Sequence, residues 1–209
     1  PFFFRQAKEK DSPKLYAQVM HAFVLFCALL MVAISVNLHW IGPLFLKGEA
    51  YAIGFSMVPM LLLGYLLLGI YFNLSIWFKL TDQTSYSLWI TLLGAGVSIA
   101  GILLLVPIWG FMGAAVSTVA CYLVMAGVCY RYGQLYYPIP YQTGKALGFL
   151  LLAFSLSYAG YFFSTGTFWL DFFLKNTAIL IFIATALLVE RNTFLHLLGK
   201  KSKFGPPPK

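Results

Sequence analysis

Long apolar runs, with no alternation of apolar and polar residues, dominate this chain. A membrane-spanning strand would alternate over about ten residues, whereas these runs are apolar at both odd and even positions for about twice that length. A helix needs about 20 residues to cross the hydrocarbon of a bilayer. The pattern therefore predicts six transmembrane α-helices, over residues 15–38, 50–78, 86–106, 111–130, 146–163 and 172–189.

The runs divide the chain into three parts: residues 1–14, a six-helix bundle over 15–189, and a basic, proline-rich tail over 190–209. The first part begins with apolar residues and continues with charged ones, which is the reverse of a signal peptide. We therefore expect residues 1–14 to be a cytoplasmic segment that follows an earlier membrane helix outside this chain.

Composition supports a membrane protein. The 209 residues are 61% hydrophobic and only 10% charged, whereas a soluble domain has about 25% charged residues. Too few polar residues are present to cover the surface of a soluble domain of this length. The composition excludes a soluble enzyme, a disordered chain and a secreted disulfide scaffold, and the predicted fold class is an all-α integral membrane protein.

The distribution of positive charge predicts the orientation of the helices. The formal net charge is +8, and the Lys and Arg residues stand at the ends of the apolar runs. If six helices alternate across the membrane, 12 of the 14 Lys and Arg residues fall on the side of the N-terminus, and only Lys47 and Lys175 fall on the other. The positive-inside rule makes the first side cytoplasmic, with both ends of the chain there. Topology thus accounts for the charge, and we expect no nucleic-acid partner.

Acidic and basic residues that could carry acid–base chemistry are absent from the middle of the predicted spans. No Asp, Glu, Lys or Arg stands in the middle of a run, and the acidic residues, Glu190 among them, fall at or beyond helix ends. Intramembrane ionisable residues would mark a proton relay or a catalytic centre. The chain also has no Ser/His/Asp set, no metal-ligand cluster and no phosphate-binding glycine loop. We predict that it is not an enzyme and that it needs no cofactor or metal.

Three polar residues on the cytoplasmic half are the candidate substrate contacts. His21 lies two turns into the first predicted helix, where it either faces a cavity and meets a phosphate head group or reaches the interface; we favour the interface. Asn73 carries an amide at membrane depth, so it bonds either another helix or a polar substrate. Lys79 closes the second helix at the interface.

The second predicted helix is the most irregular. Pro59 should kink it because proline removes a backbone donor, and Gly64 lets another helix approach closely. Two interpretations remain open: a bending helix that lines a translocation path, or ordinary membrane-helix packing, in which Gly and Pro are common.

Small residues recur in the third and fourth predicted helices. Gly96 and Ala100 are four residues apart, as are Gly110 and Ala114. This spacing follows the small-xxx-small rule for close helix contacts. We expect both pairs to lie at helix–helix interfaces.

Four stretches resemble a known family: Gly64 to Asp82, Gly110 to Ala115, Tyr136 to Pro140, and Phe2 to Lys10. Together they resemble the C-terminal half of bacterial polysaccharide (O-antigen type) flippases like those of Bacteroidota, in the MATE-like multidrug/oligosaccharidyl-lipid/polysaccharide exporter superfamily.

The resemblance implies a transporter of twelve to fourteen helices in two lobes. This chain would be the C-terminal lobe, and its partner would be the N-terminal lobe that is missing here. The substrate implied is an undecaprenyl-diphosphate-linked oligosaccharide, which crosses the bacterial inner membrane by alternating access coupled to H⁺ or Na⁺. The contacts we assign to it are His21, Asn73 and Lys79.

Two other functions stay open. A MATE-type drug exporter of the same superfamily would use acidic residues inside a lobe, and this chain has none in mid-span. A membrane enzyme of glycan assembly would carry large, charged loops on the periplasmic side, where the loops of this chain are short and almost without charge. The flippase lobe is the preferred interpretation.

Overall fold

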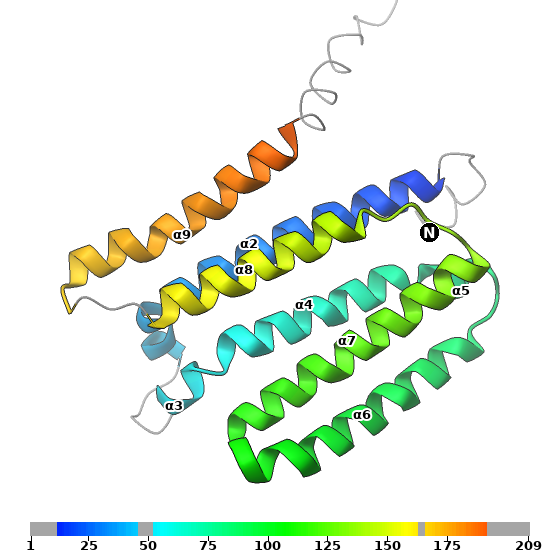
Figure 1. The fold of residues 1–209 in the computed structure, drawn as a ribbon, viewed down its shortest axis with the longest axis horizontal. Helices are drawn as coiled ribbons and strands as arrows, with labels where there is room; N and C mark the ends of the chain where they lie inside the picture. Colours follow the sequence, from blue (N-terminus) through cyan, green and yellow to red (C-terminus); the bar gives the residue numbers. More distant parts are fainter. Residues whose placement is uncertain (1–11, 46–51, 163–165, 192–209) are drawn as a thin grey trace, which may run out of the picture.

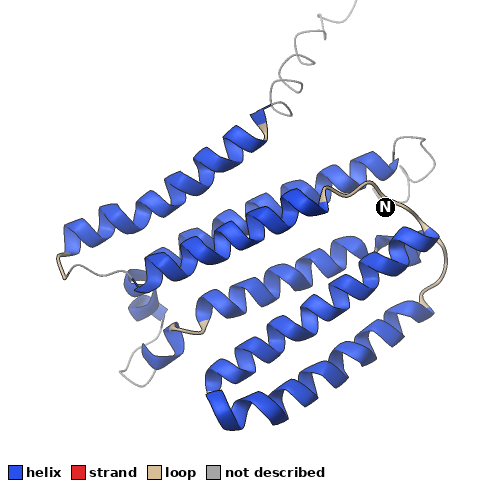
Figure 2. Ribbon diagram, in the orientation of Figure 1, coloured by secondary structure: helices blue, strands red, loops and turns tan. Residues whose placement is uncertain are grey.

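The computed structural model describes residues 12–45, 52–162 and 166–191. Within these ranges the fold contains helices, turns and bends but no strand, as Figure 2 shows. Six helical segments of the described residues are long and apolar enough to cross a membrane. The prediction of an all-helical, multi-pass membrane protein is confirmed at that level.

The helices extend beyond the apolar runs at most of their ends. The bounds are α2 (Ser12–Phe45), α3 (Ala52–Phe55), α4 (Val58–Leu74), α5 (Ile76–Leu80), α6 (Ser85–Trp109), α7 (Phe111–Tyr136), α8 (Thr143–Phe162) and α9 (Phe168–Val189). Helix α2 already begins at Ser12, inside the segment 1–14 that was expected to precede the bundle. Residues 1–11 and most of the tail 190–209 lie outside the described residues.

Two groups of helices form the bundle (Figure 1). In one group α7 packs between α6 and α4. In the other, α2 packs against α8, and α9 lies at the edge against both. The groups meet where α4 contacts α2 and α8. This arrangement gives α6 and α9 one covered side each and leaves the rest of their apolar surface for lipid.

A stripe of buried residues on α2 forms the centre of the second group. Val24, Ala28 and Val32 have no exposed surface, and their four-residue spacing places them on one face of the helix. Ala153 and Ser157 of α8 are equally buried. Small side chains let two helix backbones approach closely, which is the main source of helix association in lipid.

The second predicted helix is interrupted at both ends, which alters the expectation for Pro59. In place of the one helix predicted over 50–78, the structure has α3, α4 and α5, the last of which ends at Leu80. Pro59 lies in the first turn of α4, where its missing N–H would have no helical partner anyway. Proline therefore starts a helix here and does not kink one. Gly64 is a packing residue, since a Cβ at this position would lie 3.3 Å from Thr118 Cγ2 of α7.

The contact between α6 and α7 uses different small residues from those the spacing predicts. Gly96 and Ala100 are exposed, and a Cβ on Gly96 would meet nothing within 4 Å. The close contacts are at Gly94 and Gly101, where a Cβ on Gly101 would lie 2.7 Å from Ser117 Oγ. Gly94 and Gly101 are seven residues apart and share a face, whereas Gly96 lies about 200° round the helix from Gly94.

The predicted pair of Gly110 and Ala114 is likewise replaced. Gly110 is the turn between α6 and α7, with φ 56° and ψ −134°, a conformation that is open essentially to glycine alone. Gly113 makes the close approach, because a Cβ there would lie 2.4 Å from the carbonyl oxygen of Leu105. Ala114 is half-buried.

The two ends of the bundle differ in charge. One end, called the basic end here, contains the start of α2, the turn between α5 and α6, the α7–α8 connection and the end of α9. Five of the six Lys and Arg residues in the described ranges lie at this end: Lys14, Lys79, Arg131, Lys145 and Arg191. Lys175 lies at the opposite end. The described residues therefore have the charge asymmetry on which the predicted orientation depends.

Candidate functional site

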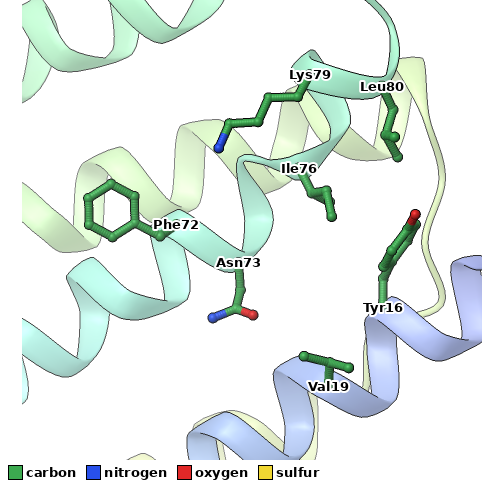
Figure 3. Close-up of a pocket in the computed structure, with 7 residues that line it drawn as sticks. All are labelled: Tyr16, Val19, Phe72, Asn73, Ile76, Lys79 and Leu80. Atoms are coloured by element: carbon green, nitrogen blue, oxygen red, sulfur yellow. The ribbon is translucent and has the colours of Figure 1, made fainter. Parts of the chain in front are cut away.

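A pocket at the basic end contains two of the three predicted contact residues. It lies between α2 and the α4–α5 segment, has a volume of about 340 Å³ and is lined by Tyr16, Val19, Phe72, Asn73, Ile76, Lys79 and Leu80 (Figure 3). It is called the Lys79 pocket below. Asn73 and Lys79 thus share one cavity, and His21 is not among its lining residues.

A break in the helix brings Asn73 and Lys79 to the same cavity. Helix α4 ends at Leu74 and α5 begins at Ile76. At the break the Ser75 hydroxyl donates to the carbonyl oxygen of Phe72 at 2.7 Å. A serine that bonds to the preceding turn in this way competes with regular helical bonding and bends the chain.

The Asn73 amide has hydrogen-bonding capacity left for a ligand. Its Nδ2 donates to the Gly69 carbonyl oxygen at 3.0 Å, within its own helix. No other described residue is hydrogen-bonded to this side chain, which projects into the pocket in Figure 3. The second N–H and the Oδ1 atom can therefore serve a polar group placed there.

Lys79 supplies the positive charge of the pocket. Its side chain is exposed and extends back from α5 alongside α4 (Figure 3). Phe72 and Ile76 of the same segment, together with Val19 of α2, give the pocket apolar walls. An ammonium and an amide above apolar walls suit an amphiphile with an anionic head group.

His21 lies elsewhere, in contact with a buried carboxylate. Its Nε2 is 3.1 Å from Glu190 Oε1 at the end of α9, and its side chain is 14% exposed. Neither ring nitrogen has a well-aligned hydrogen-bond partner among the described residues. The ring also makes an edge contact with Phe149 of α8. His21 also lines a cavity of the structure, and its reaching the membrane interface stays a prediction.

Glu190 was not among the predicted site residues, although three helices meet at its side chain. Lys145 Nζ of α8 donates to Glu190 Oε1 at 2.9 Å, and His21 of α2 approaches the same oxygen. The Glu190 side chain is only 3% exposed, so it is not part of a solvated tail. The sequence signal that could have pointed to Glu190 was that it is a single acidic residue, which follows an apolar run and stands among basic residues.

His21 lines a second cavity, which is almost entirely apolar. Its volume is about 340 Å³, and α2, α4, α7 and α8 line it with residues that include Met20, Leu67 and Leu150. Tyr141, on the α7–α8 connection, is at its edge. Burial raises the pKa of the Tyr141 phenol, which keeps the hydroxyl neutral in the physiological range.

The described residues contain no group of three His, Cys, Asp or Glu side chains that could hold a metal ion. Comparisons of the chain with protein-family models, with curated proteins and with solved structures find no match.

Proposed function

We propose that this chain is the C-terminal lobe of a lipid-linked oligosaccharide flippase. In this proposal it moves undecaprenyl-diphosphate-linked polysaccharide units across the bacterial inner membrane, with an N-terminal lobe as its partner and H⁺ or Na⁺ as the coupling ion. The resemblance of four sequence stretches and the six apolar helices support the proposal. The chain acts as a transporter and not as an enzyme.

The observation that carries the proposal is the shared cavity of Lys79 and Asn73 at the basic end. A diphosphate and its sugars cannot enter hydrocarbon alone, because their charge and hydroxyl groups would lose their hydrogen bonds to water. The Lys79 ammonium and the remaining hydrogen-bonding capacity of the Asn73 amide replace part of that hydration. Its apolar walls allow the isoprenoid chain to remain in lipid.

The breaks at the two ends of α4 give this lobe a means of movement. The chain is irregular between α3 and α4, and the helix is interrupted for one residue at Ser75, which keeps right-handed helical dihedrals and its backbone bond to Tyr71. Segments that absorb backbone rotation at both ends let the helix between them tilt as a unit. In alternating access, such a tilt of α4 would change the exposure of the Lys79 pocket.

Binding of undecaprenyl diphosphate to the full-length protein in detergent tests the proposal. Lys79→Gln removes the charge of the pocket, and Arg131→Gln is the matched control, because Arg131 is an exposed cation at the same end that lines neither the Lys79 pocket nor the second cavity. We expect Lys79→Gln to weaken binding by about tenfold, the effect of one charge-assisted bond. Equal affinity in both variants would remove the Lys79 pocket from the transport path.

The same preparation separates the alternatives. A MATE-type exporter would bind a lipophilic organic cation, and Lys79→Gln would strengthen that binding by removing a like charge. An enzyme of glycan assembly would convert a lipid-linked glycan into a product during incubation. Either result, without binding of undecaprenyl diphosphate, would replace the flippase proposal.

A further inference from the structure

The imidazole of His21 is largely enclosed by the bundle, and its nitrogens make no aligned hydrogen bond within the described residues. The side chain is 14% exposed, and both Nδ1 and Nε2 are buried without such a partner. Buried polar atoms are almost always hydrogen-bonded, so an exception calls for a physical reason. Two neighbours of the ring, a carboxylate and a cavity, supply one.

The carboxylate of Glu190 is approached by two basic groups at the same oxygen. Lys145 Nζ donates to Glu190 Oε1 at 2.9 Å. His21 Nε2 lies 3.1 Å from this oxygen, which is hydrogen-bonding distance, but the ring is not aligned with it. The Lys145 side chain is 38% exposed and that of Glu190 is 3% exposed. Of the groups around this oxygen, the lysine is therefore the one that can turn to water.

The second cavity gives the imidazole room to turn. His21 lines this cavity together with Gln142, which is exposed on the α7–α8 connection. Water at the basic end therefore reaches the rim of the cavity. A rotation of the ring into this space can align Nε2 with Glu190 Oε1 without a movement of α2.

The charges around His21 come from α8 and α9. The helices packed against α2 are α4, α8 and α9. Helix α8 contributes Lys145 and α9 contributes Glu190, whereas α4 lines the cavity with aliphatic side chains alone. The other titratable groups near this site are two phenols across the cavity, neutral at about pH 7, and two exposed cations. They are Tyr130, Tyr141, Lys14 and Arg191.

The ligand that suits this cluster is a proton. A neutral imidazole has one nitrogen with a free lone pair, and it gains a proton between about pH 8 and about pH 5. A metal cation is instead held by several oxygen ligands. Glu190 Oε1 is already bonded to an ammonium, whose positive charge repels a metal ion at the same oxygen.

We propose that His21 is a proton-binding site and that the protonated ring takes over Glu190 from Lys145. A proton from water at the basic end binds the lone pair of the neutral ring, so that both nitrogens become donors. The ring then turns, and its Nε2–H donates to Glu190 Oε1. The Lys145 ammonium, which shares this oxygen, turns to water. Loss of the proton reverses these steps.

The exchange changes which helix holds the end of α9. With a neutral His21, the charged contact of Glu190 is with Lys145 of α8. With a protonated His21, it is with α2. The site is separate from the proposed function, because it requires neither a lipid substrate nor any residue of the Lys79 pocket.

Thermal unfolding of the full-length protein in detergent at two pH values tests the inference. In Lys145→Met, the buried Glu190 carboxylate depends on His21 for a cation. In our proposal the ring is neutral at about pH 8 and charged at about pH 5.5. We expect Lys145→Met to lower the Tm clearly at the higher pH. At the lower pH this decrease should shrink by about half, because a charge-assisted bond from His21 replaces the lysine.

A variant without the imidazole separates His21 from Glu190, whose own protonation would also remove the unpaired charge. When Lys145→Met is compared with wild type in a His21→Asn background, the decrease in Tm should be the same at both pH values. His39→Asn is the matched control, because His39 is an exposed histidine near the other end of α2, and it should leave the pH effect unchanged. The same pH effect with and without His21, or no pH effect in its presence, would overturn the inference.

Solid-state NMR of the full-length protein, labelled with ¹⁵N in histidine alone, keeps the test informative if a double variant does not fold. The His21 signals are identified by their loss in His21→Asn, or by their change in Glu190→Gln. We expect the pattern of a neutral ring at about pH 8 and that of an imidazolium at about pH 5.5, in NaCl and in KCl alike. A ring that stays neutral at the lower pH, or that responds to Na⁺ at constant pH, would refute the proposal. Neither experiment involves lipid binding, so failure of the Lys79 test leaves this inference intact.

Discussion

Replacing Lys145 by methionine should destabilise this protein more than replacing its partner Glu190 by glutamine. The two side chains form one ion pair, with Lys145 Nζ 2.9 Å from Glu190 Oε1. Their exposures differ greatly, however: the Lys145 side chain is 38% exposed and that of Glu190 only 3%. The side chain that is left behind in each variant therefore determines the effect.

The expected sizes follow from this difference. In Lys145→Met the buried Glu190 carboxylate keeps His21 Nε2 at 3.1 Å but loses the lysine ammonium. Removing one partner of a buried pair costs about 3–5 kcal/mol, and the remaining contacts of Glu190 reduce this to about 2–3 kcal/mol. Glu190→Gln leaves Lys145 able to reach water and retains a neutral acceptor, so we expect a loss of about 1 kcal/mol.

Thermal unfolding in a mild detergent, followed by tryptophan fluorescence, measures the difference. For a chain of this size, 2–3 kcal/mol corresponds to a decrease in Tm of about 5–10 °C. Arg131→Met is the control, because it removes an exposed cation of the same end and should change stability by less than about 0.5 kcal/mol. If Glu190→Gln is the more destabilising variant, burial of the remaining side chain does not determine the loss of stability.

Three further predictions test the packing and the pocket. Gly101→Ala should destabilise the protein by about 1–3 kcal/mol through overpacking, whereas Gly96→Ala should stabilise it by about 0.5–1 kcal/mol through helix propensity; opposite signs in the same unfolding assay confirm which face of α6 is packed. Gly110→Ala places a side chain at φ 56° and ψ −134° and should lower the free energy of unfolding by about 1–3 kcal/mol. An unchanged Tm would contradict this backbone conformation in the α6–α7 turn. Asn73→Cys, in a protein without its own cysteines, should react with a water-soluble maleimide several times faster than Phe26→Cys, which lies on the lipid side of α2; equal rates would place Asn73 outside any hydrated pocket.

The number of helices and their approximate places were predictable from the sequence, because hydrophobic length alone selects a membrane span. Their ends were not. Helix α2 continues past residue 38 to Phe45, since intrahelical hydrogen bonds do not stop where hydrophobicity does. The helix predicted over 50–78 is interrupted, because Pro59 lacks a backbone N–H and the Ser75 hydroxyl bonds to a backbone carbonyl of the preceding turn. Hydropathy does not report such effects on backbone hydrogen bonds.

The Lys79 pocket was predictable in part. Asn73 and Lys79 stood out as polar residues near one end of an apolar run, but their common cavity depends on the break at Ser75 and on α2. Glu190 and Lys175 were assigned to helix ends on sequence position alone. Their burial results from the packing of α9 against α2 and α8, a contact between residues far apart in the chain that has no periodic signal.

The contacts of α9 explain how a thinly covered helix is held in the bundle. Near the basic end, Glu190 links α9 to α2 and α8 through His21 and Lys145. Near the opposite end, Asn37 of α2 donates to Asn176 of α9 at 3.3 Å, and Trp40 packs on Phe172.

Polar contacts at both ends fix the rotation of α9 about its axis, which a smooth apolar face in lipid would leave undefined. Helix α4 differs from α9, because the helix is interrupted at both of its ends. We therefore infer that α2, α8 and α9 form the rigid side of this bundle and that α4 is the element able to tilt. The Lys79 pocket lies between them, where relative motion changes its shape most.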